Sequence, residues 1–444
     1  MSRWRESSLP VDHVRRAVYL SYAQAMVASV YAASTGGMFL VGYALALGAR
    51  DIHIGLLSTI PMFCVLAQLP GSLVVENGAS RRRVTVAASL INVLGWGLII
   101  LIPFLATGAS AGLRLGLLIA IATFVTIFGQ IAGNARGSWV GDLVPALIRG
   151  TFFGRLGMYA GIVAAAFSLG EGYFLDTIKA HGIGAFSLLF GFGMLFGLAN
   201  VGLFAAQPDV PITTGRNGRD SFRALLKKAL HNRPLVIVIA YSTLWMMQMM
   251  SWPFLPVYML RDLKMPFVGV GAVNAVHMVM GLLAAPFWGR VVNRYGSRPV
   301  LILCSAVTAI WPPLWLLYTS AGIVYTVVAP LNIIAGFMSA GVGVGMITLL
   351  YKVTPSAGRS TQLAAHSILV QLLAAPMPAL GSCLPGVFRH LGWDVGLRGT
   401  IAAGGVFAIA ATLTSLLLIE DHAKSVRELL SNLPRHLLSR ASLR

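Results

Sequence analysis

The sequence contains little charge and very few acidic residues. Charged residues make up 11% of its 444 positions, and aspartate and glutamate together number 14. A soluble domain is about 25% charged. Hydrophobic residues make up 57% of the chain. This composition argues against a soluble protein and indicates a chain that lies largely in a lipid bilayer.

Sequence patterns of catalysis and cofactor binding are also missing. The chain has no glycine-rich phosphate loop, no paired-carboxylate site and no cluster of metal ligands. The three cysteines, Cys64, Cys304 and Cys383, show no metal or disulfide spacing, and we interpret them as small core residues. We therefore expect neither an enzyme nor a cofactor-binding protein, and no ATP-driven pump.

The chain does contain twelve long apolar stretches. Most of them exceed the ~20 residues that an α-helix needs to cross a hydrocarbon core about 30 Å thick. We predict an all-α polytopic membrane protein with twelve spans, which cover residues 18–46, 52–76, 83–106, 113–136, 153–176, 184–206, 234–260, 268–288, 299–320, 323–352, 361–388 and 400–420.

The basic residues are distributed unevenly between these spans. Of the 33 lysines and arginines, 26 lie in or next to the two termini and every second loop. By the positive-inside rule, this asymmetry predicts a multi-pass protein of the cell (inner) membrane with both termini in the cytoplasm. The net charge of +19 is then a topology signal that also favours contact with membrane lipids. We expect no nucleic-acid partner.

The chain divides into two halves around its longest polar segment. We predict an N-terminal tail, a six-helix bundle, a central loop, a second six-helix bundle and a basic C-terminal tail, which cover residues 1–17, 18–206, 207–233, 234–421 and 422–444. The two tails and the central loop are predicted to be cytoplasmic. Within the loop, Ser221 is a candidate N-cap for a short amphipathic helix. A plain tether between the halves is the alternative.

Short sequences recur at corresponding loops of the two halves. Ser80-Arg81 and Ser297-Arg298 follow the second and eighth spans, 217 residues apart. Arg149 and Arg359 follow the fourth and tenth spans, 210 residues apart. Two matches in register with six spans in each half indicate a parallel repeat. Transporters built in this way bind substrate at the interface between the halves.

The same loops resemble signatures of the major facilitator superfamily. The loop after the eighth span reads Gly289-Arg290-Val291-Val292-Asn293-Arg294-Tyr295-Gly296-Ser297-Arg298 and resembles the G-x-L-x-D-R-x-G-R-R signature, with asparagine in place of aspartate. The N-terminal copy keeps an acid at Glu76 but has Ala79 in place of the glycine. The stretch that begins at Asp142 and continues through Arg155 resembles a D-L-V-P-x-x-x-R-G-x-F-F-G-x-R motif.

This resemblance implies two pseudo-symmetric six-helix bundles, alternating access and a central cavity lined mainly by spans 1, 4, 7 and 10. It also implies cytoplasmic gate motifs at Glu76, Arg81, Asp142, Arg149, Gly289, Asn293, Arg294, Gly296, Arg298 and Arg359. Span 5 lacks the Gly-Pro pair of the drug–proton antiporters of this superfamily, which argues against multidrug efflux.

Polar residues follow helical spacing along the spans that would line such a cavity. Polar groups in a span are expected to face protein or water. We predict a substrate cavity at Gln24, Tyr31, Gln130, Asn134, Tyr241, Trp245, Gln248, Trp252, Asn332 and Gln371. The alternative for each residue is a hydrogen bond that joins two helices.

Two titratable residues inside spans are candidates for ion coupling. Glu171 is the only acid well inside a span, and Ser168 lies on the same helix face. His277 lies near the middle of the eighth span, and a histidine can carry a proton at physiological pH. The alternatives are a gate or packing role for Glu171 and a neutral, hydrogen-bonded core role for His277.

The hypothesis that follows is a monomeric secondary transporter that moves a small neutral or weakly charged organic solute by alternating access, with protons as a candidate coupling ion. A cavity without a basic residue at mid-span argues against phosphate-bearing substrates. The alternatives are an efflux pump for lipophilic compounds and a non-transporting sensor or scaffold with the same fold.

Overall fold

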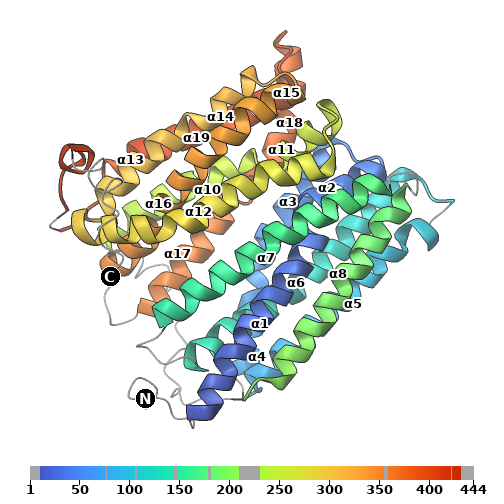
Figure 1. Ribbon diagram of the computed structural model, residues 1–444, viewed down its shortest axis with the longest axis horizontal. Coiled ribbons are helices and arrows are strands. Elements are labelled where there is room, and N and C mark those ends of the chain that lie inside the picture. The colour runs from blue at the N-terminus through green and yellow to red at the C-terminus, as the bar shows by residue number, and fades with distance from the viewer. Residues whose placement is uncertain are drawn as a thin grey trace. The chain divides into compact units, whose positions relative to one another are not determined.

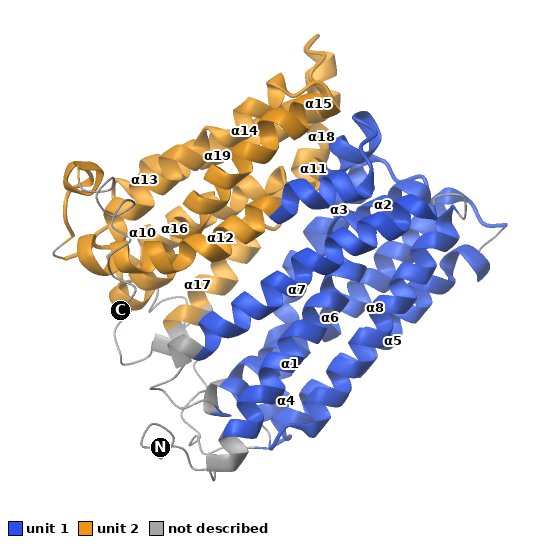
Figure 2. Ribbon diagram, in the orientation of Figure 1, with its two compact units in different colours: residues 1–217, 256–275 blue, residues 218–255, 276–444 orange. Residues whose placement is uncertain are grey.

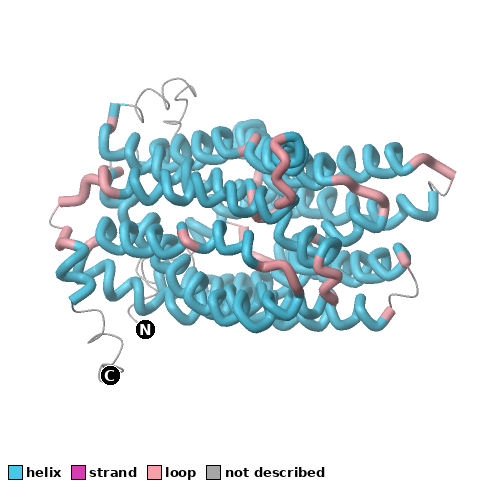
Figure 3. Tube along the Cα trace, turned by 90° about the horizontal axis from the view of Figure 1, so that it is seen from above, coloured by secondary structure: helices cyan, strands magenta, loops and turns pink. Residues whose placement is uncertain are grey.

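The computed structural model describes residues 11–76, 78–105, 108–143, 149–178, 182–209, 231–354, 359–421 and 423–431. Figure 3 shows helices joined by short loops, with no strand in this described part. Twelve helical stretches among these residues are long and apolar enough to cross a membrane. The prediction of an all-α protein with twelve spans is confirmed, and the chain is a multi-pass membrane protein.

The chain forms two compact units, shown in blue and orange in Figure 2. Unit 1 comprises residues 1–217 and 256–275, and unit 2 comprises residues 218–255 and 276–444. The amphipathic helix expected near Ser221 lies outside the described residues. The predicted domain boundaries in this linker therefore stay a prediction.

Unit 1 consists of long helices that lie side by side (Figure 1). The first and second spans are interrupted, whereas the third to sixth are single helices. Its elements are α1 (Val11–Thr35), α2 (Gly37–Ala46), α3 (Asp51–Phe63), the 3-10 turn η2 (Cys64–Ala67), α4 (Gln68–Glu76), α5 (Arg81–Leu105), α6 (Ala111–Leu143), α7 (Arg149–Thr177) and α8 (Ile183–Ala206).

Unit 2 follows the same plan with more interruptions. From Arg233 onward the elements are α10 (Arg233–Met247), η5 (Gln248–Met250), α11 (Phe254–Val257), η6 (Tyr258–Asp262), α12 (Phe267–Tyr295), α13 (Ser297–Ala309), α14 (Trp311–Leu314), η7 (Trp315–Leu317), α15 (Ala321–Ile323), η8 (Val324–Val328), α16 (Ala329–Val353), α17 (Arg359–Ala374), α18 (Met377–His390) and α19 (Gly396–Ser415). Of these, α11 and α12 are shared between the two units, and η6 lies within unit 1.

The helix pairings of the two units correspond. In unit 1, α1 packs against α7 and α8, and α5 packs against α6 and α8. In unit 2, α10 packs against α17 and α19, and α13 packs against α16 and α19. Each of these pairings in unit 1 therefore recurs six spans later, as expected of a parallel repeat.

Two of the breaks in the spans occur at a glycine and at a proline. Gly37, with φ of +52°, separates α1 from α2, because left-handed backbone is readily adopted only by glycine. The seventh span was expected as one helix over 234–260, but α10 ends at Met247 and a turn containing Pro253 separates η5 from α11. Proline lacks the amide hydrogen that a continuous helix needs.

Candidate functional site

Polar residues predicted from the first span bind neighbouring helices of unit 1. The Gln24 side chain is 1% exposed and donates to Asn200 Oδ1 on α8 at 2.6 Å. The Tyr31 hydroxyl donates to Asn92 Oδ1 on α5 at 2.8 Å, and the Asn92 amide donates to the Val125 carbonyl on α6. These contacts match the helix-joining alternative, and a role in the cavity stays a prediction.

The fourth span brings two predicted residues to the break in the second span. Gln68 Nε2 donates to Gln130 Oε1 at 2.7 Å, and Asn134 Nδ2 donates to the Gln68 carbonyl at 3.1 Å. All three residues are half-buried. These contacts form an uncharged cluster of amides, which we call the amide cluster (Gln68, Gln130 and Asn134).

The seventh span places its predicted residues in different environments. Tyr241 is fully buried, and its hydroxyl lies 2.6 Å from Ser305 Oγ on α13. Trp245 stacks on Tyr241, and Gln248 is half-buried in η5. Trp252 lies in the turn before α11, with its side chain 53% exposed. The continuous polar stripe expected from helical spacing is therefore interrupted after Gln248.

The tenth and eleventh spans contribute one buried and one half-buried predicted residue. Asn332 is 5% exposed in α16. Gln371 Nε2 donates to Ser367 Oγ on the same helix, α17, at 3.2 Å. A further pair on α10 and α17 was not predicted as a site: Ser242 Oγ lies 2.9 Å from His366 Nε2.

The two candidate coupling residues differ in their surroundings. Glu171 is 5% exposed in α7, and its Oε1 lies 2.5 Å from Ser34 Oγ of α1. His277 is half-buried in α12, and its backbone packs so closely on Gly336 that a Cβ at that glycine would clash with the His277 carbonyl. Coupling through either residue stays a prediction.

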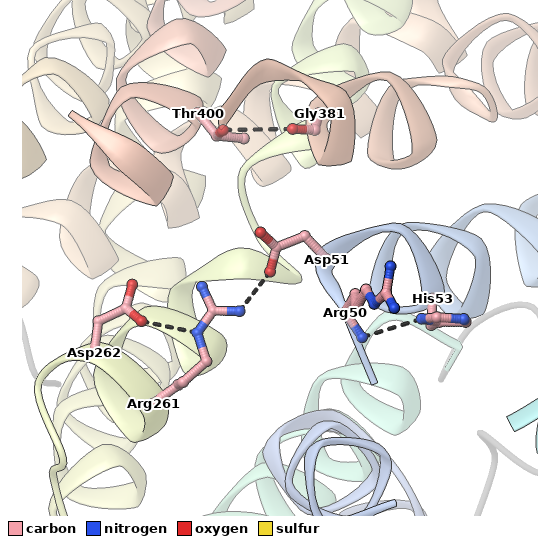
Figure 4. Close-up of polar contacts among 7 residues, drawn as sticks. All are labelled: Arg50, Asp51, His53, Arg261, Asp262, Gly381 and Thr400. Carbon is pink, nitrogen blue, oxygen red and sulfur yellow. Dashed lines mark hydrogen bonds and ion pairs between the residues drawn. The ribbon is translucent and has the colours of Figure 1, made fainter. Parts of the chain in front are cut away.

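The segment that joins the end of the seventh span to the start of the eighth belongs to unit 1. We call residues 256–275 the docking segment. Asp176, at the end of α7, accepts hydrogen bonds from the Phe267 and Val268 amides at 3.0 and 2.9 Å, and thereby caps the start of α12. Arg261 pairs with Asp51 at 2.7 Å and with Asp262 at 2.8 Å (Figure 4).

The loop that resembles a family signature in unit 2 is held by an acid from the end of the chain. Glu420 follows α19, and its side chain is 2% exposed. Its carboxylate accepts from the Ser297 amide at 3.0 Å, the Arg298 amide at 2.6 Å and Lys352 Nζ at 2.7 Å. Burial raises the pKa of this carboxyl, but the hydrogen bonds from Lys352 and the two amides lower it below its usual value. We call these four residues the C-terminal clamp.

Unit 1 has a corresponding, weaker arrangement. Asp209 follows α8 as Glu420 follows α19, 211 residues earlier. Its Oδ2 accepts from Ser80 Oγ at 2.6 Å, and Ser80 Oγ in turn accepts from the Arg83 amide at 3.2 Å. Asp209 is exposed. We call Asp209 and Ser80 the N-terminal clamp.

The remaining gate residues fall into three groups. Arg81 is 6% exposed and donates to the Ser138 carbonyl at 3.4 Å. Asn293 and Arg294 are exposed, Gly289 is half-buried, and Gly296 has a φ of +95° that favours glycine. The structure does not describe the other four gate side chains, namely Glu76, Asp142, Arg149 and Arg359.

Several partners were missed from the sequence. Asp209 lies just beyond the sixth predicted span, Glu420 is the last residue of the twelfth, and neither lies in a family motif, although their repeat spacing was a usable signal. Ser34, Asn200 and Gln68 carry polarity only, and no sequence pattern indicates which helix they face.

Comparisons with known proteins agree with this architecture. The model of the Major Facilitator Superfamily matches residues 237–442. The chain is similar to the solved structure of the nucleoside transporter NupG, with 13% identity, 92% of this chain and 99% of that chain covered, and a TM-score of 0.64. It is also similar to the D-xylose-proton symporter, with 14% identity, 92% of this chain and 99% of that chain covered, and a TM-score of 0.66.

A third similar structure is a bacterial homolog of the human lysosomal transporter Spinster, at 14% identity, 92% and 96% coverage and a TM-score of 0.64. At these identities the likeness shows the fold. A comparison with curated protein sequences finds no match.

Proposed function

We propose that the chain is a secondary transporter of the major facilitator superfamily, whose model matches residues 237–442, and that it moves a small neutral or weakly charged organic solute by alternating access. The proposal includes cytoplasmic termini and an inner-membrane location, which the distribution of basic residues and the twelve spans support. It also includes a monomer.

The amide cluster is the observation that carries the choice of solute. Its side chains are half-buried, uncharged, and able both to donate and to accept hydrogen bonds. Gln130 and Asn134 lie on the fourth span, which the family resemblance assigns to the cavity. No lysine or arginine lies at the middle of a span, so a multivalent anion would lack a buried counter-charge.

The amides also favour a polar solute over a lipophilic one. A site that hydrogen-bonds a substrate discriminates strongly against analogues that lack the bonding group, because its own polar atoms are then left unpaired. The similar solved structures include a nucleoside transporter and a D-xylose-proton symporter, and nucleosides and D-xylose are polar solutes without a required net charge. These two classes are therefore the first to test for this chain.

The test is solute uptake by the purified protein in liposomes. We expect uptake of at least one labelled nucleoside or pentose, and a loss of about tenfold or more in Gln130→Leu, Asn134→Leu or Gln248→Leu. Loss of one or two hydrogen bonds to a desolvated substrate corresponds to about 1.4–3 kcal/mol.

Ser138→Ala is the matched control on the same helix, because the Ser138 hydroxyl donates to the Ala135 carbonyl of its own turn. It should transport at the wild-type rate. Unchanged transport in all three leucine variants would refute the cavity. No uptake of any solute in the panel, together with a co-purifying protein, would instead support the sensor or scaffold alternative.

A further inference from the structure

A cavity in unit 1 combines an apolar wall with two cations. Its volume is about 470 Å³, and it is lined mainly by residues of α2, α8 and the docking segment. All of its lining residues belong to unit 1, and none belongs to the amide cluster. Its size falls in the range of about 300–1,000 Å³ that is typical of small-molecule sites. Arg261 and Lys264 are its charged lining residues, and the others are apolar.

Aromatic side chains form the apolar wall. The Phe267 ring stacks on Phe39 with centroids 6.1 Å apart and meets Phe186 edge-on at 5.8 Å. Gly42 leaves room for this ring, because a Cβ at that position would lie 2.7 Å from it. These contacts fix the two lining rings, so the wall is formed before any ligand binds.

The two cations have donors that no protein group uses. Arg261 Nη1 donates to Asp51 at 2.7 Å and Nε donates to Asp262 at 2.8 Å, whereas Nη2 makes no hydrogen bond among the described residues (Figure 4). The two carboxylates offset the Arg261 charge and hold its guanidinium in place. The exposed Lys264 ammonium has no acidic partner in the described ranges of the chain and supplies a net positive charge. Guanidinium and ammonium groups are the usual partners of a phosphate.

The backbone holds Lys264 in a conformation that a lysine rarely adopts. Its φ of +52° is the only positive value at a non-glycine residue in the described part of the chain. The next residue, Met265, is buried, and its amide donates to the Met259 carbonyl at 2.9 Å. Strained backbone of this kind occurs at ligand-binding positions, where the surrounding structure enforces it.

The polarity of the cavity changes with depth in the membrane. Gly42 lies four residues before the end of the first span and Phe186 three residues after the start of the sixth, so both are about 5–6 Å inside at 1.5 Å per residue. Arg261 is next to the last residue of the seventh span, and Lys264 follows that span. The charged end is therefore at the headgroup level and the apolar end at the acyl-chain level. A phospholipid has the same order, whereas a soluble anion has no apolar part to cover the aromatic wall.

We propose that this cavity binds an anionic phospholipid of the leaflet farther from the N-terminus. The headgroup phosphate accepts hydrogen bonds from Arg261 Nη2 and Lys264 Nζ, and one acyl chain packs on Phe186 and Phe267. The site goes beyond the proposed transport function, because it is separate from the amide cluster and does not take the solute.

The experiment counts bound lipids by native mass spectrometry of the full-length protein in detergent, with no solute present, as phosphatidylglycerol is added. We expect wild type to bind one phosphatidylglycerol more tightly than any further copy and more tightly than phosphatidylcholine. Lys264→Gln should weaken this binding about fivefold, the effect of one cation near a headgroup. Ala46→Trp, at an exposed lining position, should abolish it by filling the cavity.

Arg50→Gln is the matched control, because it removes an exposed cation close to the cavity in sequence but outside its lining. It should leave the affinity unchanged. Equal losses in Arg50→Gln and Lys264→Gln would mean attraction to surface charge alone and would overturn the proposal. Displacement of the bound lipid by inorganic phosphate would also overturn it, because the site would then recognise a soluble anion.

Lys264→Gly separates lipid binding from folding. Glycine adopts a φ of +52° readily, so this variant should unfold at the same or a higher temperature than wild type in lipid-free detergent. It should still bind phosphatidylglycerol as weakly as Lys264→Gln does. A folded Lys264→Gly variant with wild-type lipid affinity would refute the site. Because no solute is added, failure to find a transported solute leaves each of these results intact.

Discussion

Each clamp joins an acidic residue after the last helix of its unit to a serine at the start of another helix, but the two acids differ in burial. In both units a glycine of positive φ, Gly78 or Gly296, precedes a serine and an arginine at the start of a helix. In unit 1 the Ser80 hydroxyl caps that helix, and exposed Asp209 binds the hydroxyl. In unit 2 the Glu420 carboxylate binds the backbone amides directly.

The comparison shows that corresponding positions of a repeat can form a strong interaction in one unit and a weak one in the other. A buried carboxylate that accepts charge-assisted bonds from amides and a lysine contributes more than an exposed carboxylate that meets a hydroxyl in water. The family signature has aspartate where this chain has Asn293. Unit 2 nevertheless has an acid at this loop, which is supplied by the segment after α19.

The largest expected effect is the loss of the C-terminal clamp. Glu420→Ala leaves the Ser297 and Arg298 amides and Lys352 without their acceptor, and should lower the free energy of unfolding by about 2–3 kcal/mol. Asp209→Ala, the matched variant in unit 1, should lower the free energy of unfolding by less than about 1 kcal/mol. Thermal unfolding of the purified protein in detergent measures both. Equal losses in the two variants would contradict the contrast between the clamps.

The second prediction uses pH to separate charge from packing. The folded-state pKa of Glu420 is below its usual value, so its contribution to stability is complete above the ordinary glutamate pKa of about 4.3. It is lost as pH falls through the lower folded-state pKa. The difference in unfolding temperature between wild type and Glu420→Gln should therefore be constant near neutral pH and shrink below about pH 4. A difference that persists at lower pH would mean that the carboxylate charge is not what stabilises the clamp.

The smallest expected effect concerns two corresponding tyrosines. Tyr31 and Tyr241 lie 210 residues apart, and each binds a polar side chain of the third helix of its half, namely Asn92 or Ser305. Removal of one hydroxyl should lower the free energy of unfolding by about 1 kcal/mol. Tyr31→Phe should lower the free energy of unfolding more than Tyr241→Phe. The Ser305 hydroxyl can rotate to donate to another acceptor, whereas the Asn92 side-chain carbonyl is left without its donor.

The same pair of variants tests the cavity prediction. If both tyrosines only join helices, Tyr31→Phe and Tyr241→Phe will lower the unfolding temperature and leave the apparent affinity for the transported solute unchanged. An affinity change of tenfold at unchanged stability would instead place the hydroxyl against the solute.

The span count was predictable because hydropathy and length are properties of the chain alone. Partner choice was not: the polarity of Gln24 is visible in the sequence, but its contact with Asn200 depends on how α1 and α8 rotate against each other. The stripe on the seventh span assumed a regular helix, and the break before Pro253 changes the direction of every later side chain. Pro286 lies inside α12 and Pro103 lies inside α5, and neither proline breaks its helix. The presence of a proline was therefore not enough to predict a break.

Unit 1 is built from two separate stretches of the chain, and this has a practical consequence for work with fragments. An N-terminal half cut in the linker would lack residues 256–275, which belong to that unit. Its aromatic surface at Phe39 and Phe186, which Phe267 covers in the whole chain, would be exposed, and Asp176 would lose both amides. A synthetic peptide of this sequence, added in trans, should therefore rescue the solubility of that half.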